Sequence, residues 1–173
     1  WRAIKTLKVR GAPALGAAAA LGVYLGVKDS KAKTSADFAR ELDAVSRYIA
    51  SSRPTARNLF WGIERMCAVA VFNKNKPVAV IKRRLLAQAL GVIEEDRSIC
   101  RKIGAYGSRL IRNNARILTV CNTGILATID YGTALGVIYK AHEQGKKLKV
   151  YASETRPLLQ GARLTAWELK RKG

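Results

Sequence analysis

The sequence predicts an α/β protein in which a mainly helical N-terminal domain, residues 1–113, is followed by the start of a parallel-sheet domain, residues 114–173. Two observations lead to this prediction. As far as the Asn113–Asn114 pair, apolar residues recur at helical spacing or gather in Ala- and Leu-rich runs. Beyond that pair, short apolar runs alternate with helical segments, which is the pattern of parallel strands joined by crossover helices.

Three kinds of local signal predict the helices of the first domain. They are Ala- and Leu-rich runs, apolar residues three and four positions apart, and Ser, Thr or Pro at a helix start. The last stretch is long and basic, and we expect its glycines to break it into two or three pieces. The expected helices cover residues 13–27, 35–51 (capped by Thr34 or Ser35), 59–72 and 78–113 (interrupted at Gly91, Gly104 and Gly107).

The second domain is expected to alternate strands and helices. Two parallel strands cannot by themselves form a sheet that is covered on both faces. We therefore expect more strands to follow in the complete protein, so that this chain is a truncated form. The expected strands cover residues 117–121 and 148–152, and the expected helices cover residues 131–143 and 162–172.

Composition narrows the classes of function. Lys and Arg number 32 against 12 Asp and Glu, a formal charge of +20 that favours anionic partners such as phosphates. The three Cys form no CxxC pair and there is one His, which excludes a disulfide scaffold and a His-rich metal site and indicates a reduced, cytoplasmic protein. The longest uncharged run, 12–27, is too short for a bilayer, so no membrane is expected. No nucleic-acid motif accompanies the basic residues, so nucleic acid is not an expected partner.

The loops that follow the two strands are the first candidate for chemistry. In open parallel sheets, ligands bind beyond the carboxyl ends of the strands, which here carry residues 121–124 and 153–156. The first of these loops leads into a helix whose free N–H groups can hold an anion and would favour the thiolate of Cys121. The alternative is that Cys121 is a buried residue of the strand itself.

Two arginines beside helix starts are candidate phosphate ligands. Arg10 precedes Gly11 and Ala12, where glycine lets the backbone approach an anion and a guanidinium can bind phosphate through two hydrogen bonds. Arg53 stands in the same way before the proline of a later helix start. The alternative is that both arginines are surface residues at turns.

Five motifs follow one another along the chain: VRGAPA at 9–14, SRPTARNL at 52–59, CNTG at 121–124, YGTALGVI at 131–138 and ETRPLLQGARLTA at 154–166. In these residues and in this order, the chain resembles the methylthioribose-1-phosphate isomerases. Their superfamily also contains ribose-1,5-bisphosphate isomerase and the regulatory subunits of the exchange factor for translation initiation factor 2. The motifs cover nearly the whole chain.

The resemblance implies a fold, a reaction and a set of site residues. The fold is a helical N-terminal domain joined to a Rossmann-like C-terminal domain, in a homodimer. The reaction is the aldose–ketose isomerisation of 5-methylthioribose 1-phosphate to 5-methylthioribulose 1-phosphate in methionine salvage, without a metal or other cofactor. By the same resemblance, Cys121 is catalytic, and the substrate-binding residues are Arg10, Gly11, Ala12, Arg53 and Gln160.

The resemblance also implies what lies outside the chain. The family's catalytic Asp belongs to a later motif, so we expect this chain alone to be nearly inactive unless a second chain or segment completes the C-terminal domain. Ribose-1,5-bisphosphate isomerase and a non-catalytic regulatory subunit are the alternatives. Three residues depart from the family pattern: Val120 where many relatives have His, Cys100 in place of Asn, and Asp130 in place of a small residue. We expect the first two to alter the polarity of the site.

Overall fold

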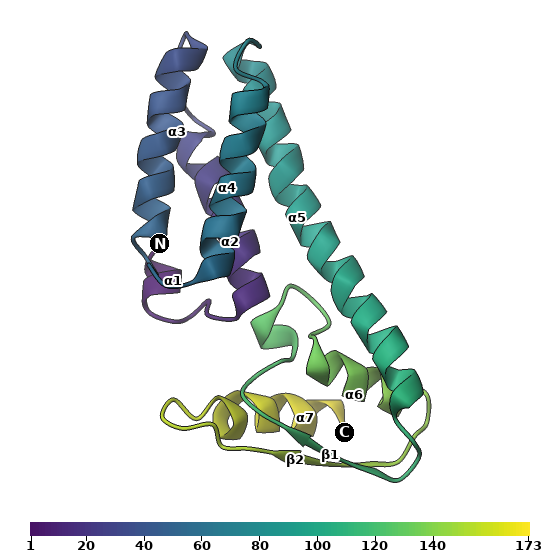
Figure 1. Cartoon of the computed structure of the whole chain (residues 1–173). Helices are drawn as coiled ribbons and strands as arrows, with labels where there is room; N and C mark the ends of the chain where they lie inside the picture. Colours follow the sequence, from purple (N-terminus) through teal and green to yellow (C-terminus); the bar gives the residue numbers. More distant parts are fainter. The chain divides into compact units, whose positions relative to one another are not determined.

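The computed structural model describes residues 1–173 and confirms the predicted fold class, with helices first and a parallel pair of strands after them (Figure 1). Contacts divide the chain into two compact units, residues 1–94 and 95–173. The domain limit at residue 113 stays a prediction, because compactness alone does not define a domain. The elements are α1 (Arg2–Lys5), α2 (Ala12–Val27), α3 (Ser35–Ala50), α4 (Arg57–Phe72), α5 (Val78–Gly107), η1 (Ser108–Leu110), β1 (Ala115–Thr119), η2 (Ile125–Ala127), α6 (Ala134–Glu143), β2 (Leu148–Ala152), η3 (Gly161–Thr165) and α7 (Ala166–Lys172).

The first unit is built around α2, which packs against α3 and α4. Its buried face carries Leu15, Val23 and Val27, each no more than 2% exposed. Small residues let the backbones of α2 and α4 come close together: a Cβ placed on Gly62 of α4 would lie 2.3 Å from the carbonyl oxygen of Gly16. Glycine at this crossing is therefore a condition of the packing, although it lowers helix propensity.

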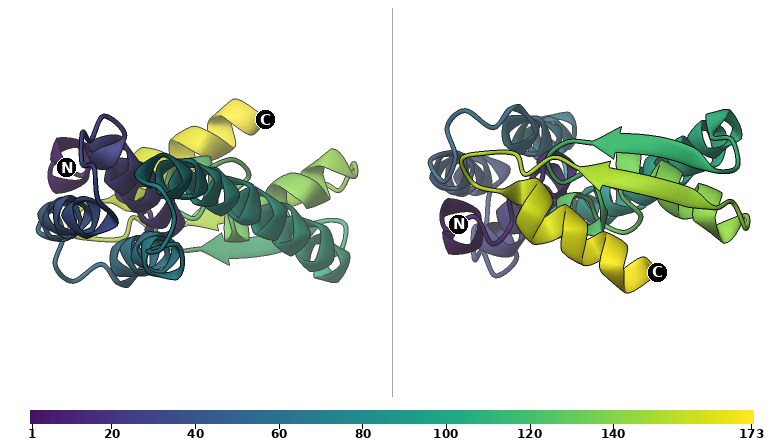
Figure 2. Two further views of the ribbon diagram at one scale, coloured as in Figure 1. Left: turned by 90° about the horizontal axis from the view of Figure 1, so that it is seen from above. Right: turned by 90° about the horizontal axis from the view of Figure 1, so that it is seen from below.

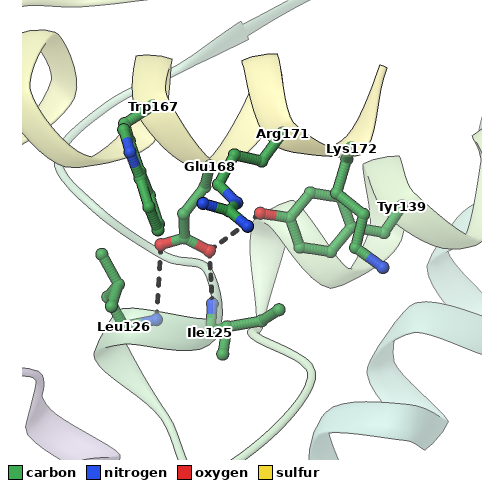
Figure 3. A pocket seen from close by; sticks show the side chains of 7 residues that line it. All are labelled: Ile125, Leu126, Tyr139, Trp167, Glu168, Arg171 and Lys172. Atoms are coloured by element: carbon green, nitrogen blue, oxygen red, sulfur yellow. Dashed lines mark hydrogen bonds between the residues drawn. The ribbon is translucent and has the colours of Figure 1, made fainter.

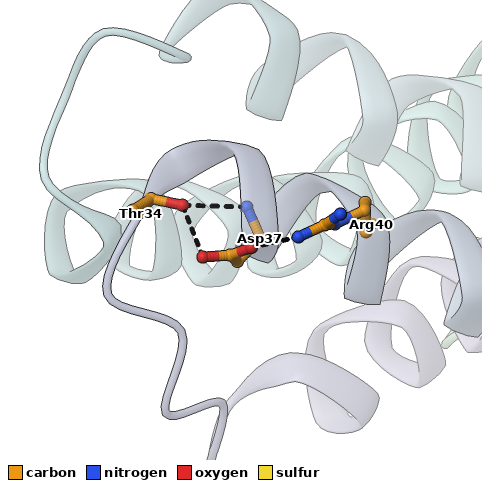
Figure 4. Close-up of polar contacts among 3 residues, drawn as sticks. All are labelled: Thr34, Asp37 and Arg40. Atoms are coloured by element: carbon orange, nitrogen blue, oxygen red, sulfur yellow. Dashed lines mark hydrogen bonds and ion pairs between the residues drawn. The ribbon is translucent and has the colours of Figure 1, made fainter.

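The start of α3 confirms one of the two predicted caps. The Oγ1 atom of Thr34 accepts a hydrogen bond from the N–H of Asp37 over 3.1 Å, so Thr34 is the N-cap and Ser35 the first helical residue (Figure 4). The hydroxyl of Thr34 also donates to the Asp37 carboxylate over 2.7 Å, and Arg40 pairs with the same carboxylate. These contacts, the Thr34 bond first, lower the pKa of Asp37.

Helix α5 runs without a break from Val78 to Gly107, so the predicted interruptions at Gly91 and Gly104 are wrong. Gly91 has open space around it and costs the helix only about 1 kcal/mol of propensity, too little to end it. Gly104 has a packing role, because a Cβ there would lie 3.0 Å from the carbonyl oxygen of Gly136 in α6. Of the three glycines, only Gly107 marks an end.

In the second unit, β1 and β2 pair in parallel, as predicted (Figure 2). One face of this sheet packs against α6, where Leu135, Ile138 and Tyr139 form a core. On the other face, Leu118 and its register partner Tyr151 are 71% and 44% exposed. Strand β2 has its predicted bounds, whereas β1 is shifted by two residues from the predicted 117–121. No helix in the structure combines the length and the apolar character that crossing a membrane requires.

Candidate functional site

Two loops leave the same edge of the parallel sheet in the second unit. Strand β1 ends at Thr119 and β2 at Ala152, its register partner, and the N–H of Ser153 donates to the carbonyl of Thr119 over 2.9 Å. The loops that follow these strands carry Cys121 and Gln160. The carboxyl edge of a parallel sheet is where such folds bind ligands, so this edge is the candidate site.

Cys121 lies beyond the strand in a backbone conformation that favours glycine, with φ at +65°. Its N–H donates to Oγ1 of Thr155 over 2.8 Å, and its carbonyl accepts from Oγ1 of Thr165 over 2.6 Å. Left-handed backbone at a non-glycine residue costs about 1–3 kcal/mol and persists only where the surroundings impose it. The interpretation of Cys121 as a buried strand residue is therefore wrong: the residue is half-buried, outside the strand and held by two threonines.

Thr155 links the two loops to each other. Besides accepting from Cys121, its hydroxyl donates to the carbonyl of Ser153 over 3.2 Å, and its own φ is +62°. The same carbonyl requires a glycine opposite it, because a Cβ on Gly161 would lie 1.6 Å from the Ser153 oxygen. Hydrogen bonds from backbone and hydroxyl groups thus connect the loops that follow β1 and β2.

Gln160 precedes the π-helical turn η3 and contributes a polar atom without a partner. Its side-chain oxygen is buried and accepts no hydrogen bond, and the same is true of the hydroxyl oxygen of Thr123, two residues after Cys121. A buried polar atom left unpaired costs about 1–3 kcal/mol and is uncommon in folded proteins. Each atom could therefore accept one further hydrogen bond at a gain in free energy. The substrate-binding role of Gln160 stays a prediction, and no sequence pattern indicated Thr123.

The N–H groups after the first loop are already occupied. The segment there is the short turn η2, and the N–H groups of Ile125 and Leu126 donate to the Glu168 carboxylate over 2.7 and 3.3 Å (Figure 3). A carboxylate of α7 therefore takes the place of an external anion at η2. The helix expected after this loop is α6, which begins at Ala134 with no side-chain cap, and its role in holding an anion stays a prediction. The sequence gives one weak signal for the Glu168 contact, the spacing of three between Thr165 and Glu168 on one helix face.

In the first unit, the structure brings together the residues predicted to bind phosphate. Gly11 is the N-cap of α2, Ala12 is its first residue, and no side chain caps this helix end. A terminal nitrogen of Arg53, Nη1, donates to the carbonyl of Arg10 over 2.9 Å. This bond uses one of five guanidinium donors, and the helix N-terminus nearby also favours an anion. The binding role of these four residues stays a prediction.

The residues that depart from the family pattern have separate surroundings. Cys100 is buried, with its sulfur 3.8 Å from Oδ1 of Asp96. Asp130 forms an ion pair with Arg101, and Val120 is 56% exposed. No group of three or more His, Cys, Asp and Glu side chains is placed to hold a metal ion.

Cys100 is expected to resist alkylation. Burial, reinforced by the Asp96 carboxylate, raises the pKa of its thiol to about 11. At pH 8, only about one molecule in 1,000 would carry the thiolate that reacts. Iodoacetamide treatment followed by peptide mass spectrometry checks this, since each Cys lies in a different tryptic peptide. Modification of Cys100 as fast as that of half-buried Cys67 would contradict the expectation.

Comparison with known proteins gives consistent matches over nearly the whole chain. Residues 8–173 match the model of the initiation factor 2 subunit family. A 5-deoxyribose 1-phosphate isomerase from Moorella thermoacetica is 54% identical over 173 residues, which cover 100% of this chain and 49% of that protein. A methylthioribose-1-phosphate isomerase from Geotalea daltonii is 55% identical over 171 residues, 99% of this chain and 49% of the relative.

A solved structure of an isomerase matches the fold of this chain over nearly its whole length. The 5-methylthioribose 1-phosphate isomerase from Pyrococcus horikoshii superimposes with a TM-score of 0.90 at 39% identity, over 99% of this chain and 48% of that chain. The chain therefore spans about half the length of the curated relatives and of the solved structure that it matches.

Proposed function

Because the chain belongs to the initiation factor 2 subunit family, we propose that it forms part of an aldose–ketose isomerase acting on a pentose 1-phosphate. The observation that carries the proposal is Cys121, held at φ +65° by two threonine hydroxyls at the carboxyl edge of a parallel sheet. The names of relatives above 50% identity support the reaction class. The proposed substrate is 5-methylthioribose 1-phosphate, in methionine salvage in the cytoplasm. One relative's name supports 5-deoxyribose 1-phosphate as a second candidate.

The isomerisation requires an acid and a base at defined positions of the sugar. A sugar that carries phosphate on C1 cannot open to a free aldehyde, so the bond between C1 and the ring oxygen must be cleaved with a proton delivered to that oxygen. The hydrogen on C2 then moves to C1 while the C2 hydroxyl loses its proton and becomes the ketone carbonyl. Oxidation at C2 balances reduction at C1, so no external oxidant or reductant is needed. A positioned acid and base and a water-poor site are sufficient.

The proposal gives each candidate residue a role in that sequence. Arg10 and Arg53, with the backbone of Gly11 and Ala12, bind the phosphate. Gln160 accepts a hydrogen bond from a sugar hydroxyl, which would satisfy its buried oxygen. Cys121 stabilises the transition state at the reacting carbons. The carboxylate that moves the proton is the family's catalytic Asp, which the resemblance places in a motif outside this chain.

The proposal includes a protein partner. Parallel sheets are ordinarily covered on both faces, yet Leu118 and Tyr151 are exposed on one face of this sheet. A second chain or segment that completes the C-terminal domain would cover these side chains. We further propose that the complete protein is a homodimer, as the family resemblance implies.

The function is tested by offering three sugar phosphates to the full-length protein that contains this sequence. We expect conversion of 5-methylthioribose 1-phosphate to the ketose, followed by nuclear magnetic resonance of the C1 and C2 signals. Preference for ribose 1,5-bisphosphate would replace the proposed substrate by its bisphosphate relative. Binding of sugar phosphate without turnover of any of the three, 5-deoxyribose 1-phosphate included, would support the regulatory subunit instead.

A pair of arginine variants tests the phosphate site in the same assay. Arg53→Ala is expected to raise KM at least tenfold, because a charge-assisted hydrogen bond contributes about 1.5–3 kcal/mol. Arg57→Ala is the matched control, since Arg57 is exposed and pairs with Glu64 over 2.8 Å. Equal KM values for the two variants would remove Arg53 from the site.

A further inference from the structure

Glu168 is a buried acidic residue whose carboxylate is surrounded by donors. It is 4% exposed. Its Oε1 atom accepts from Nδ2 of Asn122 over 2.8 Å and from the N–H of Leu126 over 3.3 Å. Its Oε2 atom accepts from the N–H of Ile125 over 2.7 Å and from the hydroxyl of Tyr139 over 2.9 Å (Figure 3). Four donors and no acceptor face the carboxylate, so each of its two oxygen atoms accepts two hydrogen bonds.

Three of the four donors belong to the loop that begins at Cys121. Thr165, one turn before Glu168, donates to the carbonyl of Cys121 over 2.6 Å and accepts from Asn122 over 3.3 Å. The carboxylate also lies against the loop backbone, because a Cβ on Gly124 would be 2.1 Å from Oε2. One face of the segment from Thr165 to Glu168 therefore contacts the loop from its first residue to the start of η2.

We propose that Glu168 is a positioning residue, which fixes the loop and thereby the backbone conformation of Cys121. The loop has no internal strand or long helix to hold it, and its first residue has a conformation that the surroundings must impose. The carboxylate adds to the hydrogen bonds of Thr155 and Thr165 by fixing the residues that follow Cys121, from a helix more than 40 residues away in sequence. The catalytic consequence rests on the proposed function, in which Cys121 lies at the reacting carbons.

A purely structural role would have a different signature. If Glu168 only stabilised the second unit, removing any of its four bonds would loosen the unit as a whole. Tyr139 donates to the same carboxylate from α6 and not from the loop, so Tyr139→Phe removes a bond without touching the loop. Cys100 lies in the same unit and reports its general loosening, because it is 1% exposed.

The test compares iodoacetamide labelling of Cys121, Cys100 and Cys67 in the full chain, resolved by peptide mass spectrometry. Glu168→Gln keeps the side-chain size but turns an amide N–H toward donors. We expect it to speed the labelling of Cys121 by about tenfold or more, the factor that losing a hydrogen bond to a charged group produces in local opening. Asn122→Ala removes a loop donor and is expected to act in the same direction. Tyr139→Phe should change the rate by less than twofold.

Each outcome decides for or against the proposal. Faster labelling of Cys121 alone, in Glu168→Gln or in Asn122→Ala, supports the positioning role of Glu168. Circular dichroism identifies a variant that fails to fold. Parallel acceleration at Cys100, an equal effect of Tyr139→Phe, or unchanged Cys121 in the folded variants overturns the proposal. With sugar phosphate, Glu168→Gln should lower kcat at least tenfold and change KM less than threefold. Absence of turnover in the unaltered protein would overturn the proposed function, while the labelling ratios would still decide the role of Glu168.

Discussion

Replacing Cys121 by serine is expected to lower kcat by about 10²–10³-fold, the usual effect of removing a group that stabilises the transition state electrostatically. Serine keeps the size of the side chain but is a far weaker acid than a thiol. The loop should keep its shape, because Thr155 and Thr165 bind the backbone of Cys121 and not its sulfur. Binding of the sugar phosphate, measured by calorimetry, is therefore expected to change less than threefold.

Cys67→Ser is the control for this substitution. Cys67 lies in the first unit, is half-buried, and has its sulfur 3.5 Å from the hydroxyl of Ser46. Its replacement should leave both kcat and KM unchanged. If Cys121→Ser turned over substrate as fast as the unaltered protein, Cys121 would have no part in the chemistry, and the site would have to be sought at the unpaired oxygens of Gln160 and Thr123.

Elements whose signals are local could be predicted closely from the sequence. Helix α3 begins at Ser35 behind the Thr34 cap, and β2 covers residues 148–152, both as predicted. In each case the deciding interaction, a cap bond within three residues or a short apolar run, is contained in the segment itself. The four residues predicted to bind phosphate lie at the start of α2 and after α3, where Arg53 donates to the carbonyl of Arg10, and their role stays a prediction.

Features that depend on a distant partner could not be predicted in this way. The glycines of α5 look like helix breakers in the sequence, and only the neighbouring Gly136 backbone gives Gly104 its packing role. Cys121 reads as the last residue of a strand, because the two threonine hydroxyls that turn its backbone lie 34 and 44 residues away. Glu168 reads as an ordinary polar residue of a terminal helix. Its donors become visible only when the loop and α7 are brought together by the fold.

Because distant partners decide what a glycine does, replacing glycine by alanine is expected to have opposite effects on stability at two helical positions. In α4, a Cβ on Gly62 would lie 2.3 Å from the carbonyl oxygen of Gly16 and 3.1 Å from its carbon. These are backbone atoms of α2, so relief requires the two helices to separate. Overpacking typically costs about 1–3 kcal/mol, and a contact with backbone atoms places Gly62 at the upper end of that range. The gain in helix propensity is about 1 kcal/mol, so Gly62→Ala should lower the free energy of unfolding by about 2 kcal/mol.

In α5, Gly91 is exposed and has no atom within 4 Å of an added Cβ. Gly91→Ala should therefore raise the free energy of unfolding by about 0.5–1 kcal/mol, because alanine restricts the unfolded chain and meets no obstacle in the helix. Urea unfolding followed by circular dichroism measures both variants. Destabilisation by both would mean that α5 does not continue through Gly91, and stabilisation by both would mean that α2 and α4 are not in close backbone contact at Gly62.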